Sequence, residues 1–216
     1  MTPPARQRPV VAAFDVDGTL TVRDCVAPFL LRLGGRRGLV TAAARRPLAT
    51  GLALLRRDRD RLKEIIVGGV LRRRRVGDVE SAGATYAQQV WERWMRSDTL
   101  ARLRWHQRHG HRTVLVSASL GPYLRPLGRL LGVDDVICTD AKSDGDRYAD
   151  RLEGANCRAA EKPRRLRAWL RSHHLDDAEL WAYGDSRGDR EMLAAADHAH
   201  LVGHAPLAEA PVGADT

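Results

Sequence analysis

The sequence is poor in cysteine. Cys25, Cys138 and Cys157 are its only cysteines in 216 residues, and no two of them stand in a CxxC spacing. An odd number of scattered cysteines does not predict the disulfide framework that small secreted domains commonly use. We therefore expect a protein of the reducing cytoplasm.

The sequence also lacks a long hydrophobic run. The best candidate for a membrane span, residues 39–55, is interrupted by two arginines and a proline, whereas a spanning helix needs roughly 18 uninterrupted apolar residues. The apolar stretch at residues 10–14 is short and leads directly into Asp15, which is unlike a signal peptide. The sequence thus predicts neither a membrane span nor a secretion signal.

Lysine is scarce although the chain is strongly basic. Only Lys63, Lys142 and Lys162 are lysines among 36 basic residues, and the formal net charge is +9. A GC-rich coding sequence yields many arginines and few lysines without any selection for binding to polyanions. Net charge also describes non-specific association and does not locate a binding site. The charge therefore does not predict a nucleic-acid partner. The arginine run at residues 72–75 is a candidate anion contact.

The chain does contain enough apolar material for one buried core, since 44% of its residues are hydrophobic. Residues 10–14 form an unbroken apolar run, typical of a strand buried on both faces of a parallel sheet. Residues 25–96 show helical spacing and predict three or four helices without a strand. After residue 98, strands and helices alternate along the chain. Strands are expected at 113–116, 136–139, 179–183 and 199–202, helices at 99–109, 122–131, 161–172 and 189–196, a hairpin or irregular excursion at 146–152, and a frayed tail after 205.

Polar residues with catalytic potential stand at four edges of this pattern. Functional groups in an open α/β sheet gather beyond the carboxyl ends of its strands. The sequences in question are DVDGT at 15–19, SAS at 117–119, Lys162 at a helix start, and GDSRGD at 184–189. They bring carboxylates, a hydroxyl and an ammonium group toward one rim of the sheet.

In order and spacing, these segments resemble the four motifs of the haloacid dehalogenase-like (HAD) phosphohydrolases. The resemblance covers residues 9–21 and about 98–203. A helical insertion after the first motif looks like the cap of the branch that includes phosphoserine phosphatase, and SAS together with GANC at 154–157 is similar to the bacterial IB-type hydrolases. The resemblance implies a doubly wound α/β core with a mostly parallel sheet (residues 1–21 and 98–216) and a helical cap (residues 22–97).

A Mg²⁺-dependent phosphomonoester hydrolase is the activity that the resemblance implies. Asp15 and Asp17 lie two residues apart, so at an extended strand end they face the same side. Asp15 would attack phosphorus to form an aspartyl-phosphate, and Asp17 would protonate the leaving group and then deprotonate water. Ion pumps of this superfamily carry Thr in place of Asp17 and dehalogenases lack Asp there, so Asp17 favours phosphate-ester turnover.

The remaining motif residues would bind metal and phosphate. We expect Mg²⁺ between the Asp15 carboxylate, the Asp17 backbone carbonyl and the Asp185 carboxylate, with the nearest oxygens of Asp15 and Asp185 within about 5 Å. Asp189 would orient Lys162 or a metal-bound water, and Lys162 would add a fixed positive charge.

The phosphate oxygens would be bound by Ser117 and by the backbone N–H groups near Gly18 and Ala118. Thr19 would steady the first loop by a hydrogen bond to its backbone. Gly18 suits a sharp turn that leaves no room for a Cβ beside the phosphate.

Each of these residues also has a purely structural interpretation. Asp15 and Asp17 fit a solvated turn, although a calcium loop is excluded because Gly18 comes too early and no Glu stands at the twelfth position. Asp185 and Asp189 fit a helix start, Ser117 fits a turn, and Lys162 fits an exposed helix start.

Asp24 and a group of histidines carry weaker signals. Asp24 stands where phosphoserine phosphatases have a Glu that contacts the substrate amino group, but a shorter Asp fits a helix N-cap equally well. His106, His109 and His111 suggest a metal cluster by their number. Their place at a predicted helix end among arginines favours solvent exposure instead.

Two functions follow from the sequence. The first is a cytoplasmic Mg²⁺-dependent phosphatase for a small phosphorylated metabolite, with the cap selecting the substrate. The alternative is a basic protein that binds nucleic acid or a membrane surface through residues 72–75 and keeps a vestigial phosphatase core. The first is favoured because every catalytic position is retained.

Overall fold

The computed structural model describes residues 8–203, 205 and 207. The strands are β1 (Val10–Phe14), β2 (Arg112–Leu120), β3 (Asp135–Asp144), β4 (Arg147–Glu153), β5 (Glu179–Gly184) and β6 (His198–Leu201). The helices are α1 (Val26–Ala44), α2 (Pro47–Leu55), α3 (Arg59–Leu71), α4 (Val76–Arg93), α5 (Ser97–Arg108), α6 (Gly121–Leu131), α7 (Glu161–Ser172) and α8 (Arg190–Ala194). Within this part of the chain every helix is too short or too polar to span a membrane. The frayed tail predicted after residue 205 lies almost wholly outside the described residues.

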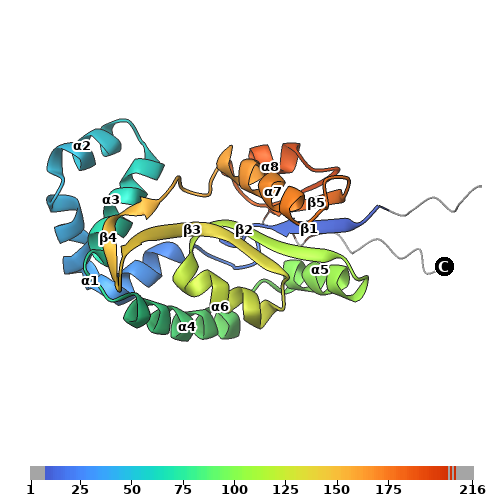
Figure 1. The fold of residues 1–216 in the computed structure, drawn as a ribbon, viewed down its shortest axis with the longest axis horizontal. Helices are drawn as coiled ribbons and strands as arrows, with labels where there is room; N and C mark the ends of the chain where they lie inside the picture. The colour runs from blue at the N-terminus through green and yellow to red at the C-terminus, as the bar shows by residue number, and fades with distance from the viewer. Residues whose placement is uncertain (1–7, 204, 206, 208–216) are drawn as a thin grey trace, which may run out of the picture.

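The strands form one sheet in the order β4-β3-β2-β1-β5-β6. All neighbours are parallel except β3 and β4, which pair antiparallel. Helices α7 and α8 cover one face of the sheet, and α5 and α6 cover the other (Figure 1). The predicted α/β fold, with a mostly parallel sheet and helices inserted after the first strand, is confirmed.

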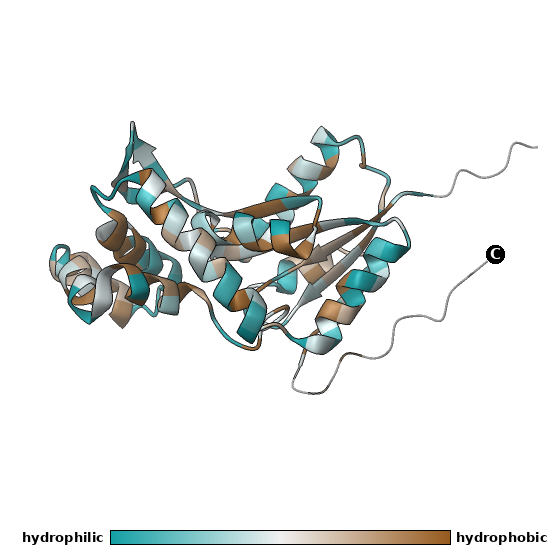
Figure 2. Cartoon of the chain, turned by 90° about the horizontal axis from the view of Figure 1, so that it is seen from below, coloured by the Kyte–Doolittle hydropathy of each residue, from teal (hydrophilic) through white to brown (hydrophobic). Residues whose placement is uncertain are grey.

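Strand β1 lies at the centre because its side chains are apolar on both faces. Ala12 and Phe14 contribute to the apolar cluster on the side of α5 and α6, and Val11 and Ala13 contribute to the cluster under α7 and α8. The central strands are correspondingly hydrophobic along their length (Figure 2). The end of β1 is therefore fixed from all sides, and so is the residue that follows it, Asp15.

Four helices, α1 to α4, form the insertion, within the predicted range of three or four. Helix α1 bends at Gly35, whose φ is +61°. The chain enters and leaves the insertion at two adjacent crossings, where Val22 N donates to Trp94 O and Arg96 N donates to Leu20 O, each at 2.8 Å. The predicted division between cap and core falls at these crossings.

Packing is continuous across this division. Phe29 of α1 and Tyr86 of α4 pack edge-to-face against Tyr123 of the core helix α6, with ring centroids 4.9 and 5.3 Å from that of Tyr123. A Cβ on Gly83 of α4 would lie 2.2 Å from the carbonyl oxygen of Pro122, so α4 touches the start of α6 with its backbone. The treatment of residues 22–97 as a separate domain stays a prediction.

Strand β3 runs five residues further than predicted because it continues into a hairpin. Strand β4 pairs with it antiparallel. Of the two structures expected at residues 146–152, a hairpin or an irregular excursion, the chain therefore forms the hairpin. The hairpin then packs on the cap: a Cβ on Gly68 of α3 would lie 2.3 Å from the carbonyl oxygen of Asp150. A polar segment thus becomes a strand because it meets a partner far away in the sequence.

The expectation that the three clustered histidines are solvent-exposed is wrong for His106. Its side chain is 0% exposed. The Nε2 atom lies 2.8 Å from the Tyr183 hydroxyl, and Nδ1 lies 2.8 Å from Nδ1 of His111. Polar partners on β5 and at the start of β2 satisfy the ring, which is the condition for burying it.

Candidate active site

The loop after β1 folds tightly around a single carbonyl group. The backbone N–H groups of Thr19, Leu20 and Thr21 all donate to Val16 O, at 3.1, 2.9 and 2.9 Å. Gly18 permits this turn with a φ of +82°. A Cβ at Gly18 would lie 2.2 Å from Oδ2 of Asp185. The group that excludes a side chain at Gly18 is thus a carboxylate of the protein, rather than the phosphate that was predicted.

Lys162 lies at the centre of the site and is 2% exposed. Its Nζ forms an ion pair with Asp15 Oδ1 at 2.5 Å and a second one with Asp189 Oδ1. Burial alone would lower the pKa of Lys162, but the charges of Asp15 and Asp189 outweigh burial and raise it. The interpretation of Lys162 as an exposed helix-start residue is therefore wrong, and its ammonium group is a fixed positive charge.

Asp15, Asp185 and Asp189 converge around this ammonium group. One oxygen of each carboxylate lies within 4.8 Å of the others, which confirms the expected approach of Asp15 to Asp185. The other Asp189 oxygen, Oδ2, accepts hydrogen bonds from Ser186 N at 3.0 Å and Ser186 Oγ at 2.7 Å. Asp189 is thus held from both sides, and its orienting role stays a prediction.

The charge balance of the site fits a divalent cation. Three carboxylates face one ammonium group, which leaves an excess of two negative charges. Desolvation, together with Asp15 and Asp189, raises the pKa of Asp185 to about 6. Clustered carboxylate oxygens are the donors that Mg²⁺ prefers, and a cation would relieve their repulsion. The ligand set of Asp15, the Asp17 carbonyl and Asp185 stays a prediction.

Asp17 is oriented separately from this cluster. Its Oδ2 accepts a hydrogen bond from Ser119 Oγ at 2.7 Å, and its Oδ1 accepts one from Cys25 N at 2.9 Å. Desolvation and the charge of Asp15 raise the pKa of Asp17 to about 7. A carboxyl group that exchanges its proton near neutral pH suits general acid–base chemistry.

Thr19 makes a different contact from the one predicted. Its hydroxyl donates to Asp15 Oδ2 at 3.3 Å, so it steadies the carboxylate rather than the backbone of the loop. Ser117 is buried, and its Oγ accepts a hydrogen bond from Ser119 N at 3.1 Å. It lies where the pairing of β2 with β3 shifts register. The phosphate-binding roles of Ser117, Gly18 and Ala118 stay predictions.

Asp24 caps the first cap helix. Its carboxylate accepts hydrogen bonds from Val26 N at 3.3 Å and Ala27 N at 3.0 Å. Asp24 therefore binds the first turn of α1 as a capping side chain does, although the N-cap position itself is Cys25. Contact with a substrate stays a prediction. The exposed side chain of Asp24 still lies close enough to Asp17 to contribute to the raised pKa of that residue.

Sequence reasoning missed Lys63, which α3 of the cap brings to the site. Its Nζ donates to the carbonyl oxygen of Ala118 and, at 2.8 Å, to Asn156 Oδ1. Asn156 in turn donates to Asp60 Oδ1 at 2.6 Å and accepts from Thr139 Oγ1 at 2.9 Å. Burial lowers the pKa of Lys63 to about 8. The scarcity of lysine was the available signal, because two of the three lysines lie at this site.

Comparisons with known proteins agree with this geometry. The family model described as haloacid dehalogenase-like hydrolase matches residues 12–194. Protein CicA of Caulobacter vibrioides is 36% identical over 199 residues, which is 91% of this chain and 87% of that protein.

Solved structures share the fold. A protein of unknown function from Bordetella pertussis Tohama I has a TM-score of 0.71 and 26% identity, with 87% of each chain covered. A substrate-bound phosphoserine phosphatase has a TM-score of 0.57 and 17% identity, with 88% of this chain and 84% of that chain covered. At that identity the second likeness concerns the fold alone.

The family match spans the four motif segments, and their carboxylates and lysine meet at one edge of the sheet. The chain therefore belongs to the haloacid dehalogenase-like hydrolases.

Proposed function

We propose that the protein is a Mg²⁺-dependent phosphatase that hydrolyses a small phosphorylated metabolite through an aspartyl-phosphate. The observation that carries the proposal is the buried Lys162 between Asp15 and Asp189, with Asp185 within 4.8 Å of both carboxylates. Asp15 and Asp189 already flank the Lys162 ammonium, so a structural ion pair does not require the exposed carboxylate of Asp185 at the same point, whereas a divalent cation would use it as a ligand.

In the first half of the reaction, a carboxylate oxygen of Asp15 attacks phosphorus and the bond from phosphorus to the ester oxygen breaks. Asp17 gives its proton to the departing oxygen, so the product leaves as a neutral alcohol. The hydrogen bond from Ser119 to Asp17 fixes the direction of this carboxyl group. Lys162 and the backbone N–H groups near Gly18 and Ala118 offset the negative charge of the transferring group.

In the second half, water attacks phosphorus while its proton passes to the Asp17 carboxylate. The bond between phosphorus and Asp15 breaks, which restores the Asp15 carboxylate and releases inorganic phosphate. When bound, Mg²⁺ would be held by Asp15, Asp185 and the Asp17 carbonyl and would supply charge neutralisation at the phosphoryl oxygens.

The cap limits the size of the substrate. Lys63 of α3 lies directly over the SAS segment, where it contacts Ala118 and Asn156. This favours a small phosphomonoester over a macromolecule, as do the phosphoserine phosphatase folds among the structural neighbours. The three cysteines are buried and unpaired, in keeping with action in the cytoplasm.

Hydrolysis of p-nitrophenyl phosphate by the purified protein tests the proposal. We expect turnover with Mg²⁺, loss of turnover with EDTA, and a loss by a factor of about 10³ or more in Asp15→Asn. Asp144→Asn is the matched control, because Asp144 is exposed at the end of β3. Full activity in Asp15→Asn, or full activity in EDTA, would remove Asp15 or the metal from the mechanism.

A second experiment concerns the intermediate. Asp17→Asn leaves the nucleophile in place but removes the group that transfers protons, so we expect turnover to fall by a factor of about 10² to 10⁴. Mass spectrometry after an acid quench should then detect one added phosphoryl group, which is absent in Asp15→Asn/Asp17→Asn. If neither Asp17→Asn nor the unmodified protein ever carries this group, the covalent route is wrong.

A further inference from the structure

Helix α2 exposes nearly all of its apolar surface. Leu48 is 89% exposed, Leu55 82%, Leu54 58% and Leu52 46%. Only Ala53 of this helix is buried. Leu48, Leu52 and Leu55 follow a spacing of four and three residues, which places them on one side of a helix. We call these three residues the leucine face; the exposed Leu54 lies on another side of the helix.

Such a concentration is unusual for a surface in water. Single exposed hydrophobic residues are common on proteins, but contiguous apolar patches mark a surface that binds something. The other exposed large hydrophobic side chains of the described residues are dispersed over α1, α6, β6 and the loop after β1. The leucine face therefore indicates a partner that is itself apolar where α2 meets it.

Arginines flank the leucine face at both ends. Within residues 45–61 six arginines are opposed by two aspartates; the arginines are Arg45, Arg46, Arg56, Arg57, Arg59 and Arg61. Among the described residues, Arg46 pairs with Asp150 and Arg61 pairs with Glu64. The other four form no salt bridge in that part of the chain. An apolar face bordered by unpaired positive charge is complementary to an apolar layer beneath negative headgroups.

Basic hollows adjoin the helix where α1 passes into α2. One of about 350 Å³ is lined by Arg45, Arg46 and Arg72, and also by Asp150, which pairs with Arg46. A second, of about 330 Å³, shares Arg45 and Arg72 and adds Arg37 and Arg73. The arginine run at residues 72–75 therefore contributes to this surface. Arg74 also lines the second hollow, although its guanidinium is bound to the carbonyl oxygens of Val70 and Leu33. Arg75 lines neither hollow.

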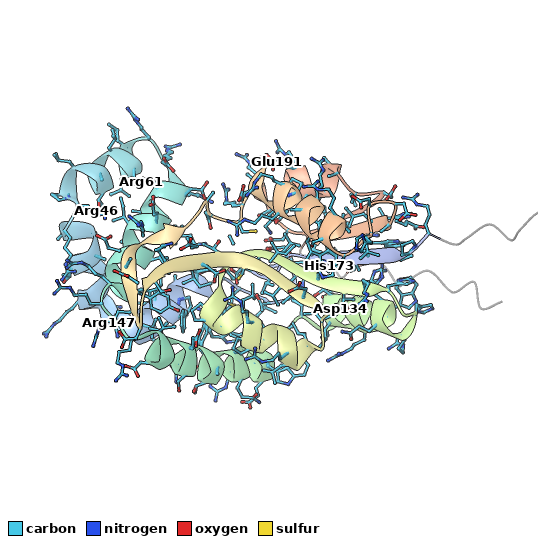
Figure 3. All side chains as sticks on the ribbon, viewed as in Figure 1. Arg46, Arg61, Asp134, Arg147, His173 and Glu191 are labelled. Atoms are coloured by element: carbon cyan, nitrogen blue, oxygen red, sulfur yellow. The ribbon has the colours of Figure 1, made fainter. Side chains whose placement is uncertain are left out.

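The position of α2 leaves it free to meet a flat surface. It lies at the outer edge of the cap, at the end of the long axis opposite α5 (Figure 1). Arg46 and Arg61 lie at this same end, away from Asp134 and His173 (Figure 3).

We propose that α2 and its flanking arginines dock the protein on an anionic phospholipid bilayer. The leucine face inserts at the level of the headgroups and upper acyl chains, and the arginines bind lipid phosphates. This role goes beyond the proposed phosphatase activity and does not depend on it. Binding to a membrane surface was part of the alternative function drawn from the sequence. Here it is combined with a working active site rather than a vestigial one.

Co-sedimentation with vesicles tests the proposal on the full-length protein. Two kinds of vesicle are used, phosphatidylcholine alone and phosphatidylcholine mixed equally with phosphatidylglycerol. We expect binding to the mixed vesicles that weakens as salt is raised. We expect Leu48→Gln/Leu55→Gln and, separately, Arg56→Gln/Arg57→Gln to lower the affinity at least about tenfold.

Matched substitutions outside α2 distinguish binding through this surface from non-specific adsorption to vesicles. Leu130→Gln/Leu201→Gln and Arg108→Gln/Arg129→Gln alter exposed leucines and arginines elsewhere, and both should bind as the unmodified protein does. Hydrolysis of p-nitrophenyl phosphate should be unchanged in the α2 variants, which shows that they are folded.

Three outcomes would overturn the proposal. The first is no binding to mixed vesicles even at low salt, and the second is equal loss of binding in the matched substitutions. The third is self-association in the analytical ultracentrifuge that Leu48→Gln/Leu55→Gln abolishes, in the absence of vesicle binding. In that case the leucine face is covered by a second copy of the chain.

Discussion

Gly18 links backbone conformation to the position of a carboxylate. Its φ of +82° lies in the region that glycine adopts without a steric penalty. The space that its missing Cβ leaves is filled by Asp185, whose Oδ2 would lie 2.2 Å from that atom. Asp185 can occupy its position beside the first motif because residue 18 of that motif is a glycine.

Gly18→Ala should abolish metal-dependent phosphatase activity, because Asp185 must move away from Asp15. Gly110→Ala is the matched control: its φ is +70°, and an added Cβ meets nothing within 4 Å. Both substitutions should cost about 1 kcal/mol of unfolding free energy through backbone strain. Thermal unfolding measures the loss of stability that the two variants share. Turnover of p-nitrophenyl phosphate measures the loss of activity expected only in Gly18→Ala, so equal turnover in the two variants would contradict the prediction.

At the scale of elements, α3 is a cap helix whose side chains bind two loops beside the site. Lys63 joins it to Ala118 after β2 and to Asn156 before α7. Asp60, at the start of the same helix, binds the amide of Asn156. Two side chains, one turn apart, thus close the cap over the site, and loss of either weakens the contact without disturbing the apolar packing of α4 on α6.

Lys63→Met should open this contact. We expect kcat/KM for a phosphorylated metabolite to fall about tenfold, since closure of a cap positions the substrate. Amides of α3 should also exchange with deuterium faster. Arg61→Met on the same helix is the control, because Arg61 is exposed and pairs only with Glu64 three residues away. Unchanged exchange in Lys63→Met would mean that this lysine does not hold the cap.

At the scale of the whole molecule, buried titrating groups change the free energy of unfolding with pH in opposite directions. Burial lowers the pKa of His106 to about 3, and the neighbouring charge of His111 adds to this, whereas an unfolded histidine titrates near 6.5. Between about pH 3 and pH 6.5, therefore, His106 binds a proton in the unfolded chain but not in the folded one. The stability contributed by neutral His106 is therefore complete above about pH 6.5 and is lost as pH falls toward 3. The raised pKa values of Asp17 and Asp185 act in the opposite direction over part of this range.

Comparison of two proteins isolates the histidine. Between pH 6 and pH 4, the unfolding free energy of the unmodified chain should fall more steeply than that of His106→Gln. The difference in slope should approach about 1 kcal/mol per pH unit, since His106 is 0% exposed. Urea unfolding at several pH values measures both slopes, and parallel slopes would show that the buried ring does not control the acid response.

Local pattern predicted the parallel strands and the polar residues at their ends. Strand β1 was predicted at its observed bounds, and Asp15 at its end, because a buried strand and the turn after it are specified by adjacent residues. Lys162 and Asp185 were predicted in the same way from the elements that carry them. Helical spacing predicted three or four helices in the insertion, and the structure has four.

Other features depend on segments that meet only in the folded chain. The contact of Lys63 with Asn156 spans 93 residues, Ser119 meets Asp17 across 102, and His106 meets Tyr183 across 77. The exposure of the leucine face likewise follows from which side of α2 is left uncovered. The sequence by itself determined the strands, the motif turns and the chemistry at their ends, since these are set by neighbours along the chain. Only the tertiary structure decided which polar groups are buried and paired, because burial depends on what packs against a residue from elsewhere.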